Sequence, residues 1–334
     1  MTVGTHRRAA ATRYRVYGSI LNCNTPLPEL NHPSHPLPRE TVDLHILFVS
    51  SDIEPPTPTS WYRTVSLPDG TPWLRCATIA SDYLLEFPDL ASFVFTPSNN
   101  SIQCIPGRKT PSHTLRHLLL DQVLPLVLNY RGREVLHGAV VATPYGACAF
   151  IGPTGSGKST LAASFLASGY SVLADDCVVL DARDDDFVAI PSYPGFRLWN
   201  DTVDALFGAA GHTAPVAHYT PKQRFYATTS ASAFPSSSVR LTGLYLLESF
   251  LGRHAPSVAT PLGRPLVGKR DALIRLLSSA FKLDIADQRM LTREFDFLHR
   301  LVSRIPVRRL LIPKSFEALP DVRAGILHDL SNSC

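Results

Sequence analysis

The segment Gly152–Ser159 holds the residues whose types and spacing are best suited to chemistry. It reads Gly-Pro-Thr-Gly-Ser-Gly-Lys-Ser and fits the pattern G-x-x-x-x-G-K-[ST] in full. Its glycines permit backbone angles and close approaches that a side chain would block. The main-chain N–H groups of such a loop form a cradle for phosphate oxygens. The lysine brings a charge to the β- and γ-phosphates, and the serine hydroxyl is a ligand for Mg²⁺.

Elements of the expected kind flank this loop. Ala147–Ile151 is an apolar run typical of a buried strand, and Thr160–Ala167 predicts a helix with Gly169 as its C-cap. The unpaired N–H groups at the start of such a helix favour an anion in the loop. The residues expected to bind the nucleotide, ATP, are Gly152, Pro153, Thr154, Gly155, Ser156, Gly157, Lys158, Ser159 and Thr160. The motif alone indicates binding and no particular reaction, because proteins of several activities share it.

A pair of adjacent carboxylates, Asp175 and Asp176, follows the short apolar run Ser171–Ala174. We expect this pair at the tip of a strand, facing the phosphate loop of a parallel sheet. Adjacent carboxylates repel each other, and a divalent cation offsets that cost. One carboxylate can hold Mg²⁺ while the other accepts a proton from an attacking hydroxyl. The alternative without chemistry is an Asp-Asp turn between two strands, and Asp184–Asp186 is expected to be a solvated hairpin turn of that kind.

Three separated features together carry a family resemblance. His137-Gly138, the glycine loop and the Ala174–Asp176 tripeptide resemble, in type and spacing, the catalytic core of HPr kinase/phosphorylase and its relatives. The resemblance covers about residues 113–250. It implies an α/β fold with a P-loop core related to phosphoenolpyruvate carboxykinase. A histidine considered alone at a strand start is usually chemically idle.

The resemblance also implies roles for individual residues. Asp175 is expected to receive the proton of a substrate serine, and His137 to lie at the phosphate-binding site. Lys158 is expected to neutralise charge that develops during transfer, and Ser159 and Asp176 to hold the metal, Mg²⁺. Members of this family assemble into hexamers, so a homo-oligomer is one further expectation.

The chain also departs from HPr kinase proper. Its loop continues Lys-Ser-Thr where the family has Lys-Ser-Glu, and the Glu-Ile-Arg-Gly signature is absent, the nearest text being Tyr193–Trp199. The N-terminal part is also unlike the family's regulatory domain. The whole chain is more similar to HPr-kinase-related proteins, some of which phosphorylate a serine of a ribosomal peptide precursor such as a lasso peptide. That group tends to have basic residues near Lys222 and Arg224, which would either neutralise the transferred phosphate or belong to a solvated loop.

These features predict an ATP-dependent serine kinase that acts on a peptide or small protein. Three alternatives stay open: an HPr kinase/phosphorylase acting on HPr, a small-molecule kinase, and a nucleotide-binding regulatory or scaffold protein without catalysis.

Composition narrows the class of protein. The 334 residues are 45% hydrophobic and 18% charged, with a formal net charge of +4, which is typical of a globular domain and gives no basic stripe for nucleic acid. Six cysteines without a C-x-x-C pair favour reduced, mostly buried thiols. No signal-peptide pattern and no apolar stretch of membrane-spanning length is found. We therefore expect a cytoplasmic protein with neither a membrane nor a nucleic acid as partner.

Patterning along the chain predicts three parts: a disordered leader at 1–13, a β-rich domain at 14–112 and the P-loop kinase domain at 113–334. The second part has strand candidates, and the third alternates strands with helices of 3.6-residue period. Residues 113–130 predict a helix that is kinked at Pro125. The segment 210–238 is expected to be a mobile loop. Predicted strands are Tyr14–Leu21, Val42–Val49, Trp73–Ile79, Val135–Ala142, Leu241–Leu247 and Arg308–Ile312; predicted helices are 270–281, 289–303 and a short terminal one. In the helix 289–303, the residues Leu291, Phe295, Leu298 and Val302 are expected to form one apolar face.

Overall fold

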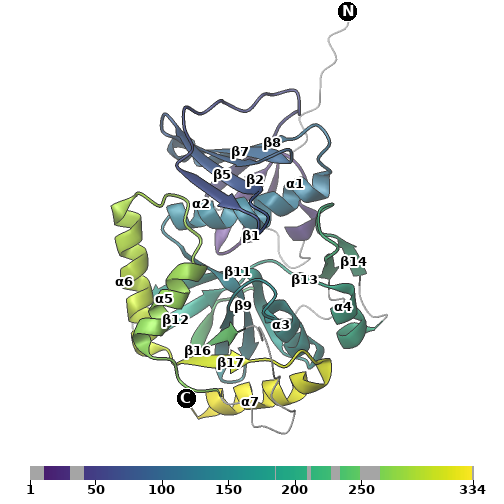
Figure 1. The fold of residues 1–334 in the computed structure, drawn as a ribbon, viewed down its shortest axis with the longest axis vertical. Coiled ribbons are helices and arrows are strands. Elements are labelled where there is room, and N and C mark those ends of the chain that lie inside the picture. Colours follow the sequence, from purple (N-terminus) through teal and green to yellow (C-terminus); the bar gives the residue numbers. More distant parts are fainter. Residues whose placement is uncertain are drawn as a thin grey trace, which may run out of the picture. The chain divides into compact units, whose positions relative to one another are not determined.

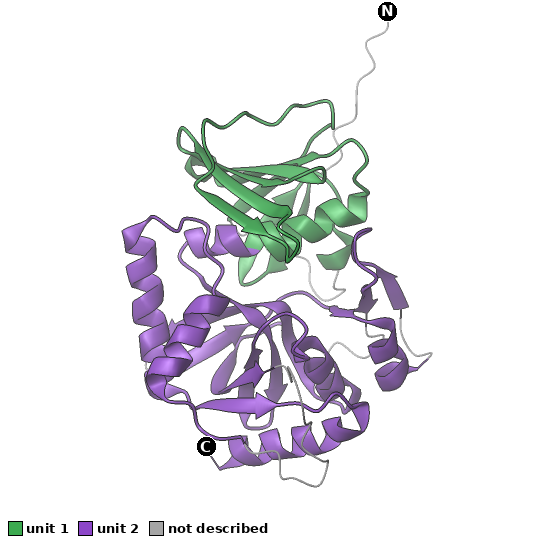
Figure 2. Ribbon diagram, viewed as in Figure 1, with its two compact units in different colours: residues 1–124 green, residues 125–334 purple. Residues whose placement is uncertain are grey.

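A computed structural model describes residues 11–30, 41–184, 186–208, 212–226, 234–248 and 264–332. The chain divides into two compact units, residues 1–124 and 125–334, which are coloured separately in Figure 2. The fold is a mixed α/β one, with a β-rich first unit (Figure 1).

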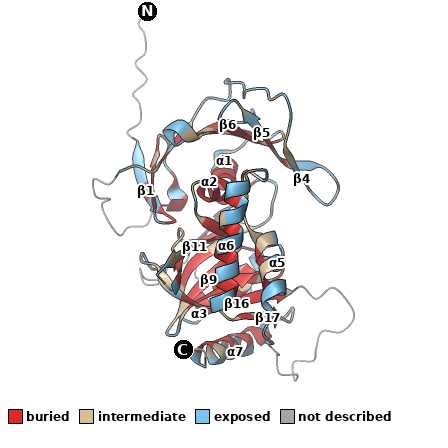
Figure 3. Cartoon of the chain, turned by 90° about the vertical axis from the view of Figure 1, so that its left-hand side faces the viewer, coloured by how far each residue is buried: buried red, intermediate tan, exposed pale blue. Residues whose placement is uncertain are grey.

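Unit 1 is built on an eight-stranded sheet with the order β1-β2-β3-β8-β7-β6-β5-β4. The pairings are antiparallel except those of β3, which runs parallel to both β2 and β8. The sheet is curved, and buried residues line its inner side (Figure 3). Its elements are β1 Thr12–Val16, β2 Ser19–Cys23, η1 Pro28–Leu30, β3 Leu44–Phe48, β4 Arg63–Ser66, β5 Pro72–Ile79, β6 Asp82–Phe87, β7 Ala91–Thr96, η2 Pro97–Asn99, β8 Ser101–Pro106, α1 Ser112–Leu118 and η3 Leu119–Val123.

The β-rich character predicted for this part is confirmed, with two differences. The predicted strand Tyr14–Leu21 is a hairpin, because Tyr17 and Gly18 both have positive φ, 52° and 71°, and form the tight turn between β1 and β2. Strand β1 also begins at Thr12, inside the range predicted as leader; residues 1–10 lie outside the described part of the chain.

The helix predicted at 113–130 is present, with an interruption. Its middle, η3, is a π-helical turn in which the N–H of Leu124 bonds to the carbonyl of Leu119. α2 (Leu124–Tyr130) follows directly, with Pro125 in its first turn. The helix was predicted to kink at Pro125; the structure instead has a π-helical turn directly before that proline.

Unit 2 contains a six-stranded sheet with the order β10-β9-β11-β12-β16-β17 and an additional β10–β16 pairing. A separate three-stranded sheet has the order β13-β15-β14. The strands are β9 Glu134–Thr143, β10 Gly146–Ile151, β11 Ser171–Arg183, β12 Asp186–Ile190, β13 Phe196–Leu198, β14 His212–Pro215, β15 Gln223–Tyr226, β16 Val239–Glu248 and β17 Val307–Leu311. The helices after α2 are α3 Lys158–Ala167, α4 Asn200–Phe207, α5 Lys269–Ser279, α6 Gln288–Arg304 and α7 Leu319–Ser331, with the short η5 Phe316–Ala318.

Helices cover both faces of the six-stranded sheet (Figure 1). Side chains of α3 and α7 form one apolar cluster with residues of β9, β10 and β16. Side chains of α5 and α6 form a second cluster with the opposite-facing residues of the same strands. The alternation of each strand between two buried faces explains why these strands read as nearly continuous apolar runs.

Most predicted strands and helices of unit 2 are found within a few residues of their expected bounds, but β11 continues past the expected end at Ala174 to Arg183, and two further details were wrong. In α6 the predicted apolar face included Leu291 and Phe295, which are 37% and 47% exposed. The buried face holds Met290, Glu294, Phe297, Leu298, Leu301 and Val302 instead. The described part of the predicted loop 210–238 contains strands β14 and β15, while 209–211 and 227–233 lie outside the described residues.

Candidate phosphate-binding and carboxylate site

The glycine loop connects the end of β10 at Ile151 to the start of α3 at Lys158. Gly157 is the N-cap residue of α3, with φ of 93°, and no side chain caps the helix. The first N–H groups of α3 therefore have no partner within the helix and can bind an anion. Residues 153–155 at the loop tip are exposed, and Ser159 and Thr160 in the first helical turn are half-buried. Gly155, with φ of 80°, occupies a left-handed conformation that suits glycine.

Gly152 lies against the neighbouring parallel strand β16. A Cβ atom at this position would stand 2.5 Å from the main-chain oxygen of Leu247 and 3.0 Å from Oγ of Ser156. Only glycine can occupy this place without a shift of the backbone. Oγ of Ser156 is buried and has no hydrogen-bond partner among the described residues, so one loop hydroxyl is left for a ligand.

The Lys158 side chain folds back into the loop. Its Nζ donates hydrogen bonds to the carbonyl oxygens of Gly152 and Pro153, at 2.8 and 2.9 Å, and the residue is 6% exposed. Burial lowers the pKa of this ammonium; Asp175 opposes the shift and the positive charges of Lys222 and Arg197 add to it, with a resulting pKa of about 8. The ammonium is thus held at the loop by hydrogen bonds to neutral carbonyl groups. A charged phosphate oxygen forms a stronger hydrogen bond with an ammonium and can replace them.

The acidic pair does not lie at a strand tip, and the strands around it are not parallel, so both expectations were wrong. Asp175 and Asp176 lie in the middle of β11, which continues without interruption from Ser171 to Arg183. β11 pairs antiparallel with β9, and β9 pairs antiparallel with β10. Asp176 is opposite Gly138 of β9, and Gly138 is opposite Ile151 of β10. The pair therefore reaches the loop by lying beside the end of β10 across one intervening strand, not at the end of its own strand.

Asp176 has an unusual backbone conformation for a residue within a strand. Its φ is 73°, in the left-handed region that costs a non-glycine residue about 1–2 kcal/mol and that aspartate tolerates better than most residues. This conformation breaks the side-chain alternation of β11. As a result two adjacent carboxylates contact the same residue, Arg197: its main-chain N–H donates to Oδ2 of Asp175 at 3.2 Å, and its guanidinium forms an ion pair with Oδ2 of Asp176.

The Asp175 carboxyl combines burial with an open hydrogen-bonding position. Its Oδ1 is buried and has no hydrogen-bond partner in the described part of the chain. Burial raises the pKa of this carboxyl, while the charge of Arg197 and a hydrogen bond from the Ser159 hydroxyl oppose the rise. A carboxylate whose proton affinity is raised in this way is a better proton acceptor.

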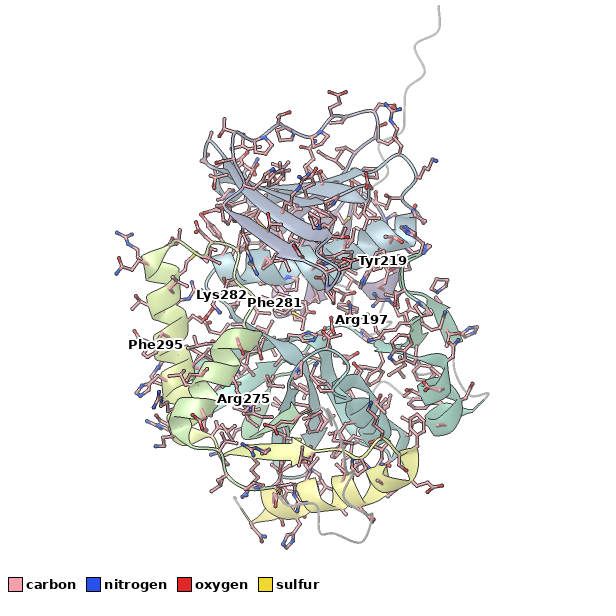
Figure 4. All side chains as sticks on the ribbon, in the orientation of Figure 1. Arg197, Tyr219, Arg275, Phe281, Lys282 and Phe295 are labelled. Atoms are coloured by element: carbon pink, nitrogen blue, oxygen red, sulfur yellow. The ribbon has the colours of Figure 1, made fainter. Side chains whose placement is uncertain are left out.

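His137 binds the backbone of the acidic pair. Its Nδ1 lies 3.0 Å from the main-chain oxygen of Asp176, and because a carbonyl can only accept, Nδ1 carries the proton. Burial and the charges of Lys158, Arg197 and Lys222 lower the pKa of His137 to about 3, so the ring is neutral at physiological pH and its buried Nε2 is an acceptor. The ring also meets Phe281 edge-on, with centroids 6.4 Å apart (Figure 4 labels Phe281).

The sequence predictions did not assign a role to Arg197, which lies on β13 of the small sheet (Figure 4). In the sequence, Arg197 stands out only as a residue of Tyr193–Trp199, the segment most similar to the absent Glu-Ile-Arg-Gly signature. A lone arginine in the segment Tyr193–Trp199 carries no local signal, because its carboxylate partners are reached only through the pairing of distant strands.

Two further cations lie on or beside the small sheet, where the sequence had left their role open. Burial and the positive charge of Arg197 lower the pKa of Lys222, while the nearby Asp175 carboxyl opposes this shift. Its Nζ lies 5.5 Å from the ring centroid of Trp199. Arg224 is opposite Arg197 in the β13–β15 pairing and donates from a guanidinium nitrogen to the Tyr193 hydroxyl at 3.3 Å. Lys222 thus acts electrostatically on the Asp175 carboxyl.

The donor set can be compared with the needs of Mg²⁺, a hard cation that takes oxygen ligands and keeps several waters. The Ser159 hydroxyl and the Asp176 carboxylate are oxygen donors of the right kind beside the phosphate loop, so the residues fit such an ion. Among the described residues no group of three or more His, Cys, Asp or Glu side chains could hold a metal unaided. Any ion here would therefore depend on phosphate oxygens and water for the rest of its ligands.

Other predictions concern the chain as a whole. The described cysteines, at 23, 76, 104, 148 and 177, are all buried free thiols, as expected. In the portion that the structure describes, no helix is both long enough and apolar enough to cross a membrane.

Comparisons with known proteins point to a structural likeness. No protein-family model matches the chain, and no curated protein matches it. Among solved structures it is similar to the HPr(Ser) kinase/phosphatase from Coxiella burnetii, with 11% sequence identity and a TM-score of 0.32, over 60% of this chain and 99% of that one.

Proposed function

We propose that this chain is a cytoplasmic, ATP-dependent serine kinase that transfers the γ-phosphoryl group to a hydroxyl of a peptide or small protein. The observation that carries the proposal is the meeting of three groups: the Lys158 ammonium in the glycine loop, the Ser159 hydroxyl, and the Asp175 carboxyl that accepts from that hydroxyl. A phosphate-binding loop and a proton acceptor of raised pKa in one cluster are the two parts that transfer to an alcohol needs.

The proposed reaction assigns one task to each group. The loop N–H groups and Lys158 bind the β- and γ-phosphates and stabilise the charge that grows on the bridging oxygen. Asp175 accepts the hydroxyl proton as the serine Oγ–P bond forms and the bond from the γ-phosphorus to the bridging oxygen breaks, so ADP leaves. His137 fixes the main chain of Asp176 and so the strand that presents the base. Lys222 adds a positive charge on the same side.

The metal part of the proposal concerns Ser159 and Asp176. These residues would hold Mg²⁺, and the bound ion would neutralise part of the phosphate charge. The role predicted for Asp176 as a metal ligand is kept in the proposal, although its carboxylate is paired with Arg197 in the free protein.

A transfer assay tests the proposal. The purified chain is incubated with γ-phosphate-labelled ATP and Mg²⁺, and with either purified HPr or synthetic serine peptides, each matched by its Ser→Ala variant. We expect label on a serine acceptor and none on the alanine variant, with phosphoserine identified by mass spectrometry. Label on HPr would favour the HPr-directed alternative, and label on free serine or another small alcohol a small-molecule kinase.

One observation favours a second candidate, a nucleotide-binding regulatory protein without catalysis. The Arg197 guanidinium forms an ion pair with Asp176, which is the arrangement expected if Asp176 has a structural role and no catalytic one. This candidate predicts ATP-dependent thermal stabilisation with neither transfer nor appreciable hydrolysis. Transfer to any hydroxyl acceptor would exclude it.

A further inference from the structure

Arg197 contacts the two carboxylates with two different groups. Its main-chain N–H binds Oδ2 of Asp175, and its guanidinium binds Oδ2 of Asp176. Any substitution at position 197 except proline keeps the first contact, because the N–H belongs to the backbone. The side chain can therefore be changed to act on Asp176 while the hydrogen bond to Asp175 stays in place.

Asp176 is held from both sides. His137 donates to its carbonyl oxygen, and the left-handed backbone turns its carboxylate toward Arg197. Both members of this ion pair are largely buried, with side chains 12% and 17% exposed. A cation that needs the Asp176 carboxylate must therefore compete with a guanidinium that water screens only weakly.

The charges of the cluster favour an anion over a free metal ion. Three cations, Lys158, Arg197 and Lys222, act electrostatically on the Asp175 carboxyl, and Arg197 is also paired with Asp176. A divalent cation approaching the free protein meets a net positive site. A polyphosphate reverses that sign, and it also offers Arg197 a partner with a higher charge than Asp176.

We propose that Arg197 is a positioning residue that withholds Asp176 from divalent cations until a polyphosphate is bound. The inference rests on the proposed function, since it concerns the metal that would assist transfer at the same site. The free protein then has little affinity for a divalent cation alone, and it binds the cation together with the nucleotide.

Mn²⁺ alone, detected by electron paramagnetic resonance, is the probe that tests the inference. Wild type and Arg197→Gln are titrated with Mn²⁺ in the absence of nucleotide. An adjacent opposite charge changes the proton affinity of a carboxylate by roughly one to three pKa units, so we expect Arg197→Gln to bind Mn²⁺ at least about tenfold more tightly. The double variant Arg197→Gln with Asp176→Asn is expected to lose that gain, because it lacks the carboxylate that the cation would use.

A matched control is Arg240→Gln, which removes an arginine from another Arg–Asp pair of unit 2, that with Asp186 at 3.1 Å. It changes the net charge equally and should leave Mn²⁺ affinity at the wild-type value. Equal Mn²⁺ affinity of wild type and Arg197→Gln would overturn the inference, as would a gain that persists in the double variant. If Arg197→Gln does not fold, Arg197→Lys replaces it and is expected to show a smaller gain of the same sign.

The readout separates this inference from the proposed function. Mn²⁺ binding without nucleotide needs no acceptor and no transfer. A chain that gains Mn²⁺ affinity on loss of Arg197 but never phosphorylates an acceptor would support the inference and contradict the kinase proposal. Transfer to an acceptor, together with equal Mn²⁺ affinity of wild type and Arg197→Gln, would support the kinase proposal and overturn the inference.

Discussion

The peptide N–H of Arg197 donates a hydrogen bond to Oδ2 of Asp175 across 3.2 Å, so a strand of the small sheet fixes the orientation of a carboxylate in the large one. With Oδ2 held, Oδ1 is the oxygen left without a partner among the described residues. The carboxyl therefore presents one open oxygen and has a pKa raised by burial, and it lies beside the Ser159 hydroxyl in the first turn of α3. This is the geometry expected of a positioned proton acceptor.

Asp175→Asn should nearly abolish transfer while leaving the nucleotide bound. The asparagine oxygen can keep the hydrogen bond from Arg197, but the amide on the other side cannot accept a proton. Loss of a positioned base lowers the transfer rate by roughly 10²–10⁴-fold. ATP affinity, measured by calorimetry, should stay the same or rise, since a negative charge beside the phosphates is removed.

The matched control for this variant is Asp181→Asn on the same strand, where the carboxylate is 39% exposed and lies 3.5 Å from Arg133. We expect wild-type transfer from it. Transfer at the parental rate by Asp175→Asn would show that Asp175 is not the proton acceptor.

Lys158→Met should weaken ATP binding without loss of stability. A charge-assisted hydrogen bond contributes about 1.5–3 kcal/mol, so the dissociation constant for ATP should rise by roughly ten- to a hundredfold. The methionine has a similar length and avoids the cost of burying the ammonium, which the lowered pKa of Lys158 reflects. Calorimetry with ATP and chemical denaturation check the two parts.

Lys269→Met is a closely matched control. Lys269 is the first residue of α5 and follows a glycine N-cap, as Lys158 does in α3, but it is exposed. It should bind ATP like wild type. An equal loss in both variants would mean that the effect comes from net charge and not from the loop.

The sequence allowed the local elements of this site to be predicted, because periodicity and glycine spacing are local properties. The strand before the loop and the helix after it are where the pattern puts them. The direction of the strands was not predictable in the same way. Apolar runs buried on both faces read alike whether their neighbours run parallel or antiparallel, and β9 and β11 proved to be antiparallel to each other.

The position of the acidic pair and its partner depended on tertiary structure. A pair of aspartates between two apolar runs is typical of a turn, yet β11 passes through Asp176 with a positive φ and stays paired with β9. Arg197 reaches this pair from a three-residue strand that pairs with β15, and whose other residues, Phe196 and Leu198, are buried in the apolar cluster with α3. Neither the strained backbone nor the contact between sheets leaves a mark in the local sequence.

Gly152→Ala should destabilise unit 2. The new Cβ would stand 2.5 Å from the main-chain oxygen of Leu247, and a backbone oxygen in a paired strand cannot move aside cheaply. Overpacking of this kind costs about 1–3 kcal/mol of folding free energy. Gly268→Ala, where a Cβ meets nothing within 4 Å, is the control and should be neutral or slightly stabilising. Chemical denaturation measures both, and equal stability of the two variants would contradict the close approach of β10 and β16.

Glu294 on α6 predicts a pH dependence of stability that is independent of the candidate site. The residue is 2% exposed, and Oε1 lies 2.8 Å from Nζ of Lys282 (Figure 4 labels Lys282). Burial raises the pKa of this carboxyl above its ordinary value of 4.5, while Lys282 and Arg293 oppose the rise. The folded state therefore binds more protons than the unfolded state as the pH passes above 4.5.

This proton linkage means that the free energy of unfolding falls as the pH rises from about 4.5 through the raised pKa. Glu294→Gln lacks that ionisation, so wild type should lose stability relative to the variant over this pH window and then keep a constant difference. Urea denaturation of both proteins between pH 4 and pH 8 measures the difference in their free energies of unfolding. The contributions of the other titrating groups are the same in both proteins and cancel in this difference. Glu317→Gln, at an exposed position of the same unit, is the control for the exchange of glutamate for glutamine. A difference between wild type and Glu294→Gln that does not change with pH, or that grows in favour of wild type, would mean that the carboxyl is already ionised at no cost in the folded state.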